Sequence, residues 1–147
     1  MSQVRNAGAF LGAVAVAYLL ATAFSTQQVI AKQAAFGATY TPAQQFQTLI
    51  ANLTGFWAYG AMLAIALGVG FFVAMLVKRV LTPLAPIAYP VAGAAAVGLM
   101  IYLIENVVLP GGVGIIGGAR DALGVALQMG AGASAGVVFE MLRVRRA

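Results

Sequence analysis

The sequence has no cysteine and no histidine, and these two absences exclude much of the usual chemistry of protein sites. Without cysteine the chain can form no disulfide and has no thiolate to act as a nucleophile or metal ligand. Without histidine it lacks the commonest general base near neutral pH and the commonest transition-metal ligand. Only three carboxylates remain, and they lie far apart in the sequence: Glu105, Asp121 and Glu140. The sequence therefore predicts neither an enzyme nor a metal or cofactor site.

Charged residues are scarce in this chain, and hydrophobic residues are abundant. Of the 147 residues, 63% are hydrophobic and 7% are charged, and the mean hydropathy is +0.98. A soluble protein of average composition has about 25% charged residues. We therefore expect a single membrane domain, residues 1–147, surrounded mainly by lipid. The net charge of +5 does not indicate nucleic acid, because the basic residues lie at the ends of apolar runs.

Four apolar runs are long enough to cross a bilayer, which takes about 20 helical residues. They cover residues 7–24, 56–77, 90–109 and 121–142, and they predict an all-α bundle of four transmembrane helices. The first run also has features of a secretory signal peptide, because Arg5 precedes it and Ala21-Thr22-Ala23 fits an A-x-A cleavage site. We expect this helix to be retained, because the run is longer than the usual h-region of about 7–15 residues.

The distribution of lysine and arginine predicts the orientation of the bundle. If the N-terminus is cytoplasmic, the basic residues on the inside are Arg5, Lys78, Arg79, Arg143, Arg145 and Arg146. Only Lys32 and Arg120 then lie outside. The positive-inside rule therefore favours a bundle with both termini in the cytoplasm. The layout is typical of small proteins of the bacterial inner membrane.

Residues 25–55 form the longest segment between apolar runs, and the predicted orientation places them outside. The second half of this segment begins with a capping pattern, in which Thr41 is the N-cap, Pro42 is the first helical residue and Gln44 completes a capping box. An apolar stripe follows at helical spacing: Phe46, Leu49, Ile50 and Leu53. We expect an amphipathic helix over Pro42–Thr54, with its stripe on the membrane surface or on the bundle. A simple extension of the second span fits the pattern equally well.

Small residues recur at four-residue spacing in three of the runs, and such tracks let membrane helices approach closely. One track consists of Ala9, Ala13, Ala17 and Ala21. The other predicted packing positions are Gly8, Gly12, Gly60, Ala64, Gly68, Gly124, Gly132 and Gly136. Gln128 replaces a small residue on the last track, so we expect its amide to form a hydrogen bond across a helix interface. These tracks fit packing within one chain, and they also fit self-association.

Polar residues gather near the predicted outer ends of the third and fourth helices. Glu105 and Asn106 precede the turn between these helices, Arg120 and Asp121 follow it, and Gln128 lies deeper in the fourth helix. Ionisable residues inside a membrane are candidates for a functional site. A Glu105 paired with Arg120 would be structural, whereas an unpaired Glu105 could carry protons. Asp121 in a first helical turn also suits the helix dipole.

Interfacial residues are expected at both ends of the bundle. Trp57 and Tyr59 begin the second run, where amphipathic aromatic residues anchor membrane proteins. Glu140 and Arg143 are spaced to pair along one helix face. A basic tail can bind anionic lipid and consists of Arg143, Arg145 and Arg146.

The turn between the last two runs contains GVGIIG, residues 112–117, which fits the spacing of a dinucleotide-binding loop. That motif requires a preceding strand and a following βαβ unit. Here an apolar helix precedes it, so the pattern indicates a glycine-rich turn and no nucleotide. The sequence favours a small non-catalytic membrane protein, an accessory or structural subunit that contacts partner helices or lipids. The alternative is a subunit of a homo-oligomeric transporter or channel that uses the polar residues around Glu105 and Arg120.

Overall fold

The computed structural model describes residues 2–109 and 116–144, and this part of the chain is helical without strands. Four helices are long and apolar enough to cross a membrane, as the sequence predicts. They are α1 (Ser2–Ala34), α3 (Trp57–Val80), α4 (Ala88–Leu103) and α5 (Ala122–Val144). The shorter elements are α2 (Pro42–Gly55), η1 (Thr82–Leu84), η3 (Gly117–Ala119) and η2 (Ile104–Val108), a π-helical turn that extends α4.

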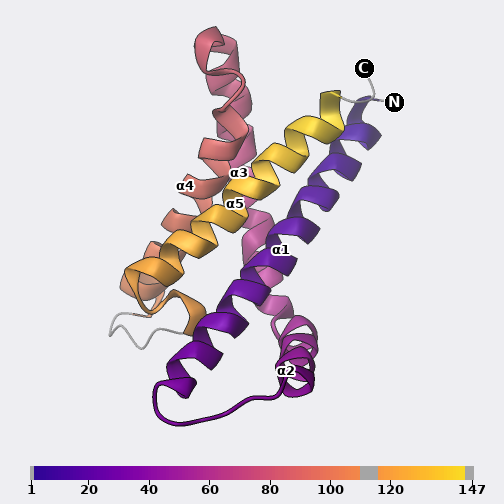
Figure 1. Ribbon diagram of the computed structural model, residues 1–147. Coiled ribbons are helices and arrows are strands. Elements are labelled where there is room, and N and C mark those ends of the chain that lie inside the picture. The colour runs from indigo at the N-terminus through magenta and orange to yellow at the C-terminus, as the bar shows by residue number, and fades with distance from the viewer. Residues whose placement is uncertain (1, 110–115, 145–147) are drawn as a thin grey trace.

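Helix α5 lies between α1 and α4. Figure 1 shows α1 and α5 running side by side in opposite directions, so that the start of α1 and the end of α5 meet at one end of the molecule. Helix α3 packs mainly on α4 and more sparsely on α1. Helix α2 lies at the opposite end from the termini and contacts α1.

The first helix is longer than the sequence predicts. It continues to Ala34, although residues 25–34 were expected to begin the outer loop. Two of the polar residues in this part, Ser25 and Thr26, are buried against other elements of the bundle. The predicted start of a helix at Pro42 is confirmed, because Thr41 caps α2 and forms a complete capping box with Gln44. Pro90 lies in the first turn of α4, where proline is tolerated.

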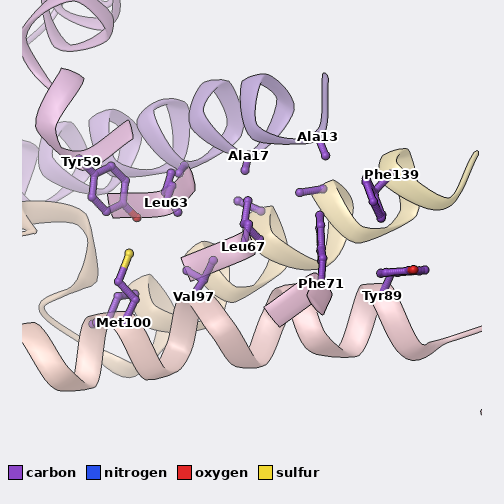
Figure 2. Packing of buried hydrophobic residues seen from close by; sticks show 14 of the residues in the cluster. Ala13, Ala17, Tyr59, Leu63, Leu67, Phe71, Tyr89, Val97, Met100 and Phe139 are labelled. Atoms are coloured by element: carbon purple, nitrogen blue, oxygen red, sulfur yellow. The ribbon is translucent and has the colours of Figure 1, made fainter. Parts of the chain in front are cut away.

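The core is built from small residues of α1 and larger residues of α3. Alanines at four-residue spacing line the buried face of α1: Ala9, Ala13, Ala17 and Ala21. Leu63, Leu67 and Phe71 of α3 lie between that face and α4 in Figure 2. The small side chains of α1 therefore leave room for the large ones of α3.

Glycines bring the backbones of α4 and α5 into direct contact. A Cβ at Gly93 would lie 2.1 Å from the carbonyl oxygen of Gly132, and one at Gly136 would lie 2.2 Å from that of Tyr89. Gly124, in the first turn of α5, is similarly close to the carbonyl oxygen of Gly118. The predicted glycine track of α5 is therefore a contact within the chain.

The other predicted packing positions meet side chains or open space. Gly60 faces the ring of Tyr18, and Gly68 faces the ring of Phe10. Gly12 is next to Leu142, whereas Ala64 is half-buried. Gly8 has no neighbour near its Cβ position within the described chain, so it makes no close helix contact inside this bundle.

Candidate functional site

The amide side chain of Gln128 on α5 is completely inaccessible to solvent. Its Oε1 accepts a 2.7 Å hydrogen bond from the hydroxyl of Tyr59 on α3. Its Nε2 donates two bonds of 3.0 Å to α1, one to the carbonyl oxygen of Ala21 and one to Oγ of Ser25. The amide thus joins three helices, as expected for a polar residue inside a helix interface.

Tyr59 was expected at the membrane interface, and this expectation is wrong. The side chain is 8% exposed and its hydroxyl points to Gln128 in the core. Trp57, two residues earlier, is 75% exposed and keeps the position of an interfacial anchor. Residues two positions apart lie about 200° apart around a helix, so Tyr59 faces the core where Trp57 faces outward.

A second group of hydrogen bonds connects α1 to α2. The amide nitrogen of Asn52 donates to Oγ1 of Thr26 at 2.9 Å, and this hydroxyl donates in turn to the carbonyl oxygen of Thr22. The hydroxyl of Tyr18 donates to the carbonyl oxygen of Leu53 at 2.7 Å. Buried Thr22, Ser25 and Thr26 therefore give α1 a polar face where it meets α2 and α5.

The outer polar cluster predicted around Glu105 is not one network among the described residues. The ion pair at this end joins Asp121 to Lys32, with 3.1 Å between Oδ2 and Nζ. Asn106 donates to the carbonyl oxygen of Tyr102 in its own helix. Glu105 lies half-buried in the π-helical turn η2. Gln128 is occupied by its bonds to α1 and α3.

Asp121 is the N-terminal cap of α5. Its Oδ1 accepts a 2.7 Å hydrogen bond from the backbone N–H of Gly124. This bond, and next the hydrogen bond from Lys32, hold the pKa of the Asp121 carboxyl below its usual value. The carboxylate therefore stays charged where the helix dipole favours a negative charge.

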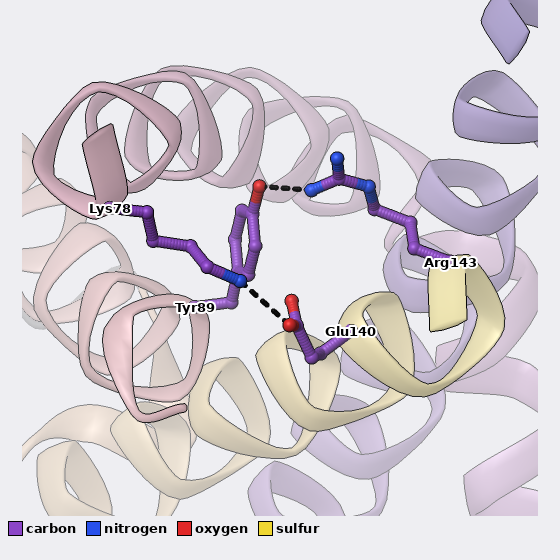
Figure 3. A network of polar contacts seen from close by, with 4 residues as sticks. All are labelled: Lys78, Tyr89, Glu140 and Arg143. Atoms are coloured by element: carbon purple, nitrogen blue, oxygen red, sulfur yellow. Dashed lines mark hydrogen bonds and ion pairs between the residues drawn. The ribbon is translucent and has the colours of Figure 1, made fainter. Parts of the chain in front are cut away.

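The opposite end of the bundle carries a cluster that the sequence pattern did not reveal. Nζ of Lys78 on α3 lies 2.7 Å from Oε1 of Glu140 on α5. Between these helices the ring of Tyr89 on α4 has the Lys78 ammonium 4.7 Å and the Arg143 guanidinium 5.4 Å from its centroid. Arg143 also donates a hydrogen bond to the Tyr89 hydroxyl, as Figure 3 shows.

One prediction about this end needs correction. Glu140 was expected to pair with Arg143 along α5, but its partner is Lys78 on another helix. The guanidinium of Arg143, a residue of the predicted lipid-binding tail, donates to Tyr89 and lies 5.4 Å from the ring of Phe139. Arg145 and Arg146 lie outside the described residues.

Aromatic residues from all four long helices meet next to this cluster. The ring of Phe71 stacks on that of Phe139 at 4.7 Å between centroids. It also meets the rings of Tyr89 at 5.6 Å and Phe10 at 6.3 Å, edge to face. Such contacts add to the packing of a core, so this end of the bundle is both ionic and closely packed.

An apolar groove of about 480 Å³ opens between α3 and α4. Small residues mark the place where the two helices meet: Gly70, Ala92 and Ala96. Ile65, Val69 and Leu99 line the groove and are 70%, 62% and 58% exposed. The groove has no charged lining residue, so its walls are suited to an apolar occupant.

The turn with the GVGIIG pattern is described only in part, because residues 110–115 lie outside the described ranges. Its last glycines form η3, where Gly118 is closely packed against Ser25 of α1. Comparison of the chain with protein-family models, with curated proteins and with solved structures found no match. Function is therefore inferred from the geometry of this chain.

Proposed function

We propose that the protein is a non-catalytic membrane subunit whose α3–α4 groove binds a transmembrane helix of another membrane protein. The observation that carries this proposal is the groove itself, an apolar depression of about 480 Å³ on the outer surface of the bundle. Membrane helices associate by close packing around small residues. Ala95 supplies an exposed small residue in the groove, beside the small residues of the α3–α4 contact, and large exposed side chains border it.

The distribution of polar groups also supports a structural role. Gln128 uses both of its amide atoms to join helices, and Lys78 is paired with Glu140. These groups hold the bundle together in the half that carries Lys32 and Asp121 and at the end near the termini. The alternative, transport through a homo-oligomer around Glu105 and Arg120, has less support because Asp121 and Gln128 of that cluster are bonded to α1.

A photo-crosslinking amino acid at Val69 tests the proposal in cells that make the protein. We expect Val69 to crosslink to a distinct second protein. The same amino acid at Leu19, a 53% exposed residue of α1, serves as the control and should give no such product. Crosslinks to lipid alone at both positions would contradict the proposal, and crosslinks to a second copy of the chain would favour the homo-oligomer.

A variant that fills the groove provides a second, independent test. Ala95 is exposed and lines the groove, so Ala95→Phe should reduce the Val69 crosslink at least several-fold. Ala15 is an exposed alanine of α1, and Ala15→Phe should leave the crosslink unchanged. An equal effect of both substitutions would show that bulk alone, and not the groove, changes the contact.

A further inference from the structure

Helix α2 presents three different faces. One face contacts α1 through Asn52, which bonds Thr26, and through Leu53, whose carbonyl oxygen accepts from Tyr18. Leu49 is half-buried on the same side. Successive residues are about 100° apart around a helix. The side chains of Phe46 and Ile50 therefore lie beside the face that contacts α1. Gln44 and Gln47 are exposed on the side opposite to it.

The apolar stripe predicted for α2 is therefore divided by the fold. Leu49 and Leu53 turn toward α1, whereas Phe46 and Ile50 remain 64% and 44% exposed. A helix whose whole stripe served the bundle would bury its largest member, but Phe46 is left outside. Within the described bundle, α1 covers only the half of the stripe that consists of Leu49 and Leu53.

The exposed half of the stripe continues into the surface of a membrane-spanning helix. Phe56 is 40% exposed and links α2 to α3, and Trp57 is the first residue of α3. No charged residue occurs between Lys32 and Lys78, so α2 is uncharged along its whole length. An uncharged helix with one apolar edge and one amide-rich edge is suited to the boundary between acyl chains and water.

The ion pair of Lys32 and Asp121 indicates where this boundary lies. Its side chains are 38% and 45% exposed and stand at the end of α1 and the start of α5. Thr26, which holds Asn52 of α2, lies about 9 Å from Lys32 along α1 at 1.5 Å per residue. This places Asn52, in the last turn of α2, close to the edge of the apolar layer.

We propose that α2 is an interfacial helix that inserts Phe46 and Ile50 among the lipid chains and keeps Gln44 and Gln47 in water. The occupant of the exposed stripe is thus the lipid surface at the end of the bundle that carries Lys32 and Asp121. This inference is independent of the partner helix proposed for the α3–α4 groove, which lies on other elements.

Nitroxide scanning tests the proposal directly, because the chain has no cysteine and any introduced cysteine is the only labelling site. The variants Phe46→Cys, Ile50→Cys, Gln44→Cys and Gln47→Cys are labelled and placed in vesicles of phosphatidylethanolamine and phosphatidylglycerol. We expect the ratio of collisions with oxygen to collisions with a water-soluble nickel chelate to be several-fold higher at 46 and 50 than at 44 and 47. Equal ratios at the four sites would overturn the proposal. Shielding of 46 and 50 from both reagents would also overturn it, because protein would then cover them.

The unmodified protein provides a second measurement that needs no variant. Trp57 is the only tryptophan and is exposed at the end of α2, so its fluorescence reports the depth of this region. We expect stronger quenching by a nitroxide near the lipid headgroup than by one near the end of the acyl chain, together with weak quenching by aqueous iodide. Stronger quenching from the chain end would place α2 too deep, and dominant iodide quenching would place it in water.

Discussion

At the scale of single residues, Gln128 shows how a polar side chain can stabilise a bundle in lipid. Its three hydrogen bonds reach α1 and α3 at once, and both the amide and the Tyr59 ring are buried. In an apolar medium an unpaired amide or hydroxyl group is costly. Gln128 therefore specifies how α1, α3 and α5 align, because a shift of one helix would break its hydrogen bonds and leave buried polar groups unpaired.

A double-mutant cycle measures this contribution. Gln128→Leu and Tyr59→Phe each remove one side of the 2.7 Å hydrogen bond between the two residues. We expect a coupling free energy of about 0.6 kcal/mol, with an upper value of about 1.7 kcal/mol, which is the range for such bonds between membrane helices. Unfolding by SDS in mild detergent gives the four free energies. A coupling of zero would mean that the hydroxyl and the amide do not interact in the folded protein.

Two glycines of α5 allow a matched comparison. A Cβ at Gly132 would lie 2.3 Å from the carbonyl oxygen of Gly93, whereas one at Gly130 would have nothing within 4 Å. Gly132→Ala must push α4 and α5 apart, so we expect it to lower the free energy of unfolding by about 1–3 kcal/mol. Gly130→Ala should instead raise it by about 0.5–1 kcal/mol, because alanine is the better helix former. A similar loss for both, again measured by SDS unfolding, would show that α4 does not touch α5 at Gly132.

At the scale of elements, the capped start of α5 predicts a dependence of stability on pH. The pKa of Asp121 is lowered in the folded protein, first by the Gly124 N–H and then by Lys32. A lowered pKa stabilises the fold above the unfolded value of about 3.9, and this contribution is lost as the pH falls through the folded value. Asp121→Asn keeps an oxygen for Gly124 but loses the charge. We therefore expect wild type to be more stable than Asp121→Asn at pH 7, and the difference to shrink below about pH 4. A difference that stays constant from pH 7 to pH 3 in unfolding measurements would contradict this assignment.

The elements that local patterns control could be predicted from the sequence. Four spans follow from apolar length, and the start of α2 follows from Thr41, Pro42 and Gln44. The second half of α1 could not be predicted, because its serine, threonine, glutamine and lysine residues lower the hydropathy of residues 25–34 to that of a loop. The cost of burying Ser25 and Thr26 is offset by hydrogen bonds from Gln128 and Asn52, which come from distant parts of the chain.

The polar sites were harder to predict than the helices for the same reason. Sequence spacing pairs Glu140 with its neighbour Arg143, but the fold brings Lys78 to it from α3. Likewise Asp121 finds Lys32 at the end of α1, beyond the predicted limit of that helix. Each of these contacts depends on which helices are adjacent, and apolar periodicity alone does not determine adjacency.

At the scale of the whole molecule, two ion pairs stand at opposite ends of α5. Asp121 pairs with Lys32 at its start, and Glu140 pairs with Lys78 near its end. The two carboxylate residues are about 28 Å apart along the helix at 1.5 Å per residue. A bilayer has an apolar core of about 30 Å, so the ion pairs are spaced as expected for the two edges of that core.

This arrangement predicts which parts of the chain are reached from each side of the membrane. The start of α1 and the α3–α4 connection lie at the end with Lys78, and α2 lies at the end with Lys32. Because more basic residues occur at the Lys78 end, the positive-inside rule predicts that this end faces the cytoplasm. Single cysteines at Gln3, Gln33 and Thr82, all exposed, can be labelled in intact cells with a membrane-impermeant maleimide. We expect Gln33→Cys to react in intact cells, and Gln3→Cys and Thr82→Cys to react only after the membrane that holds the protein is permeabilised. The reverse pattern would invert the bundle, and labelling of Gln3→Cys and Thr82→Cys from opposite sides would be incompatible with α1 and α3 both crossing the membrane.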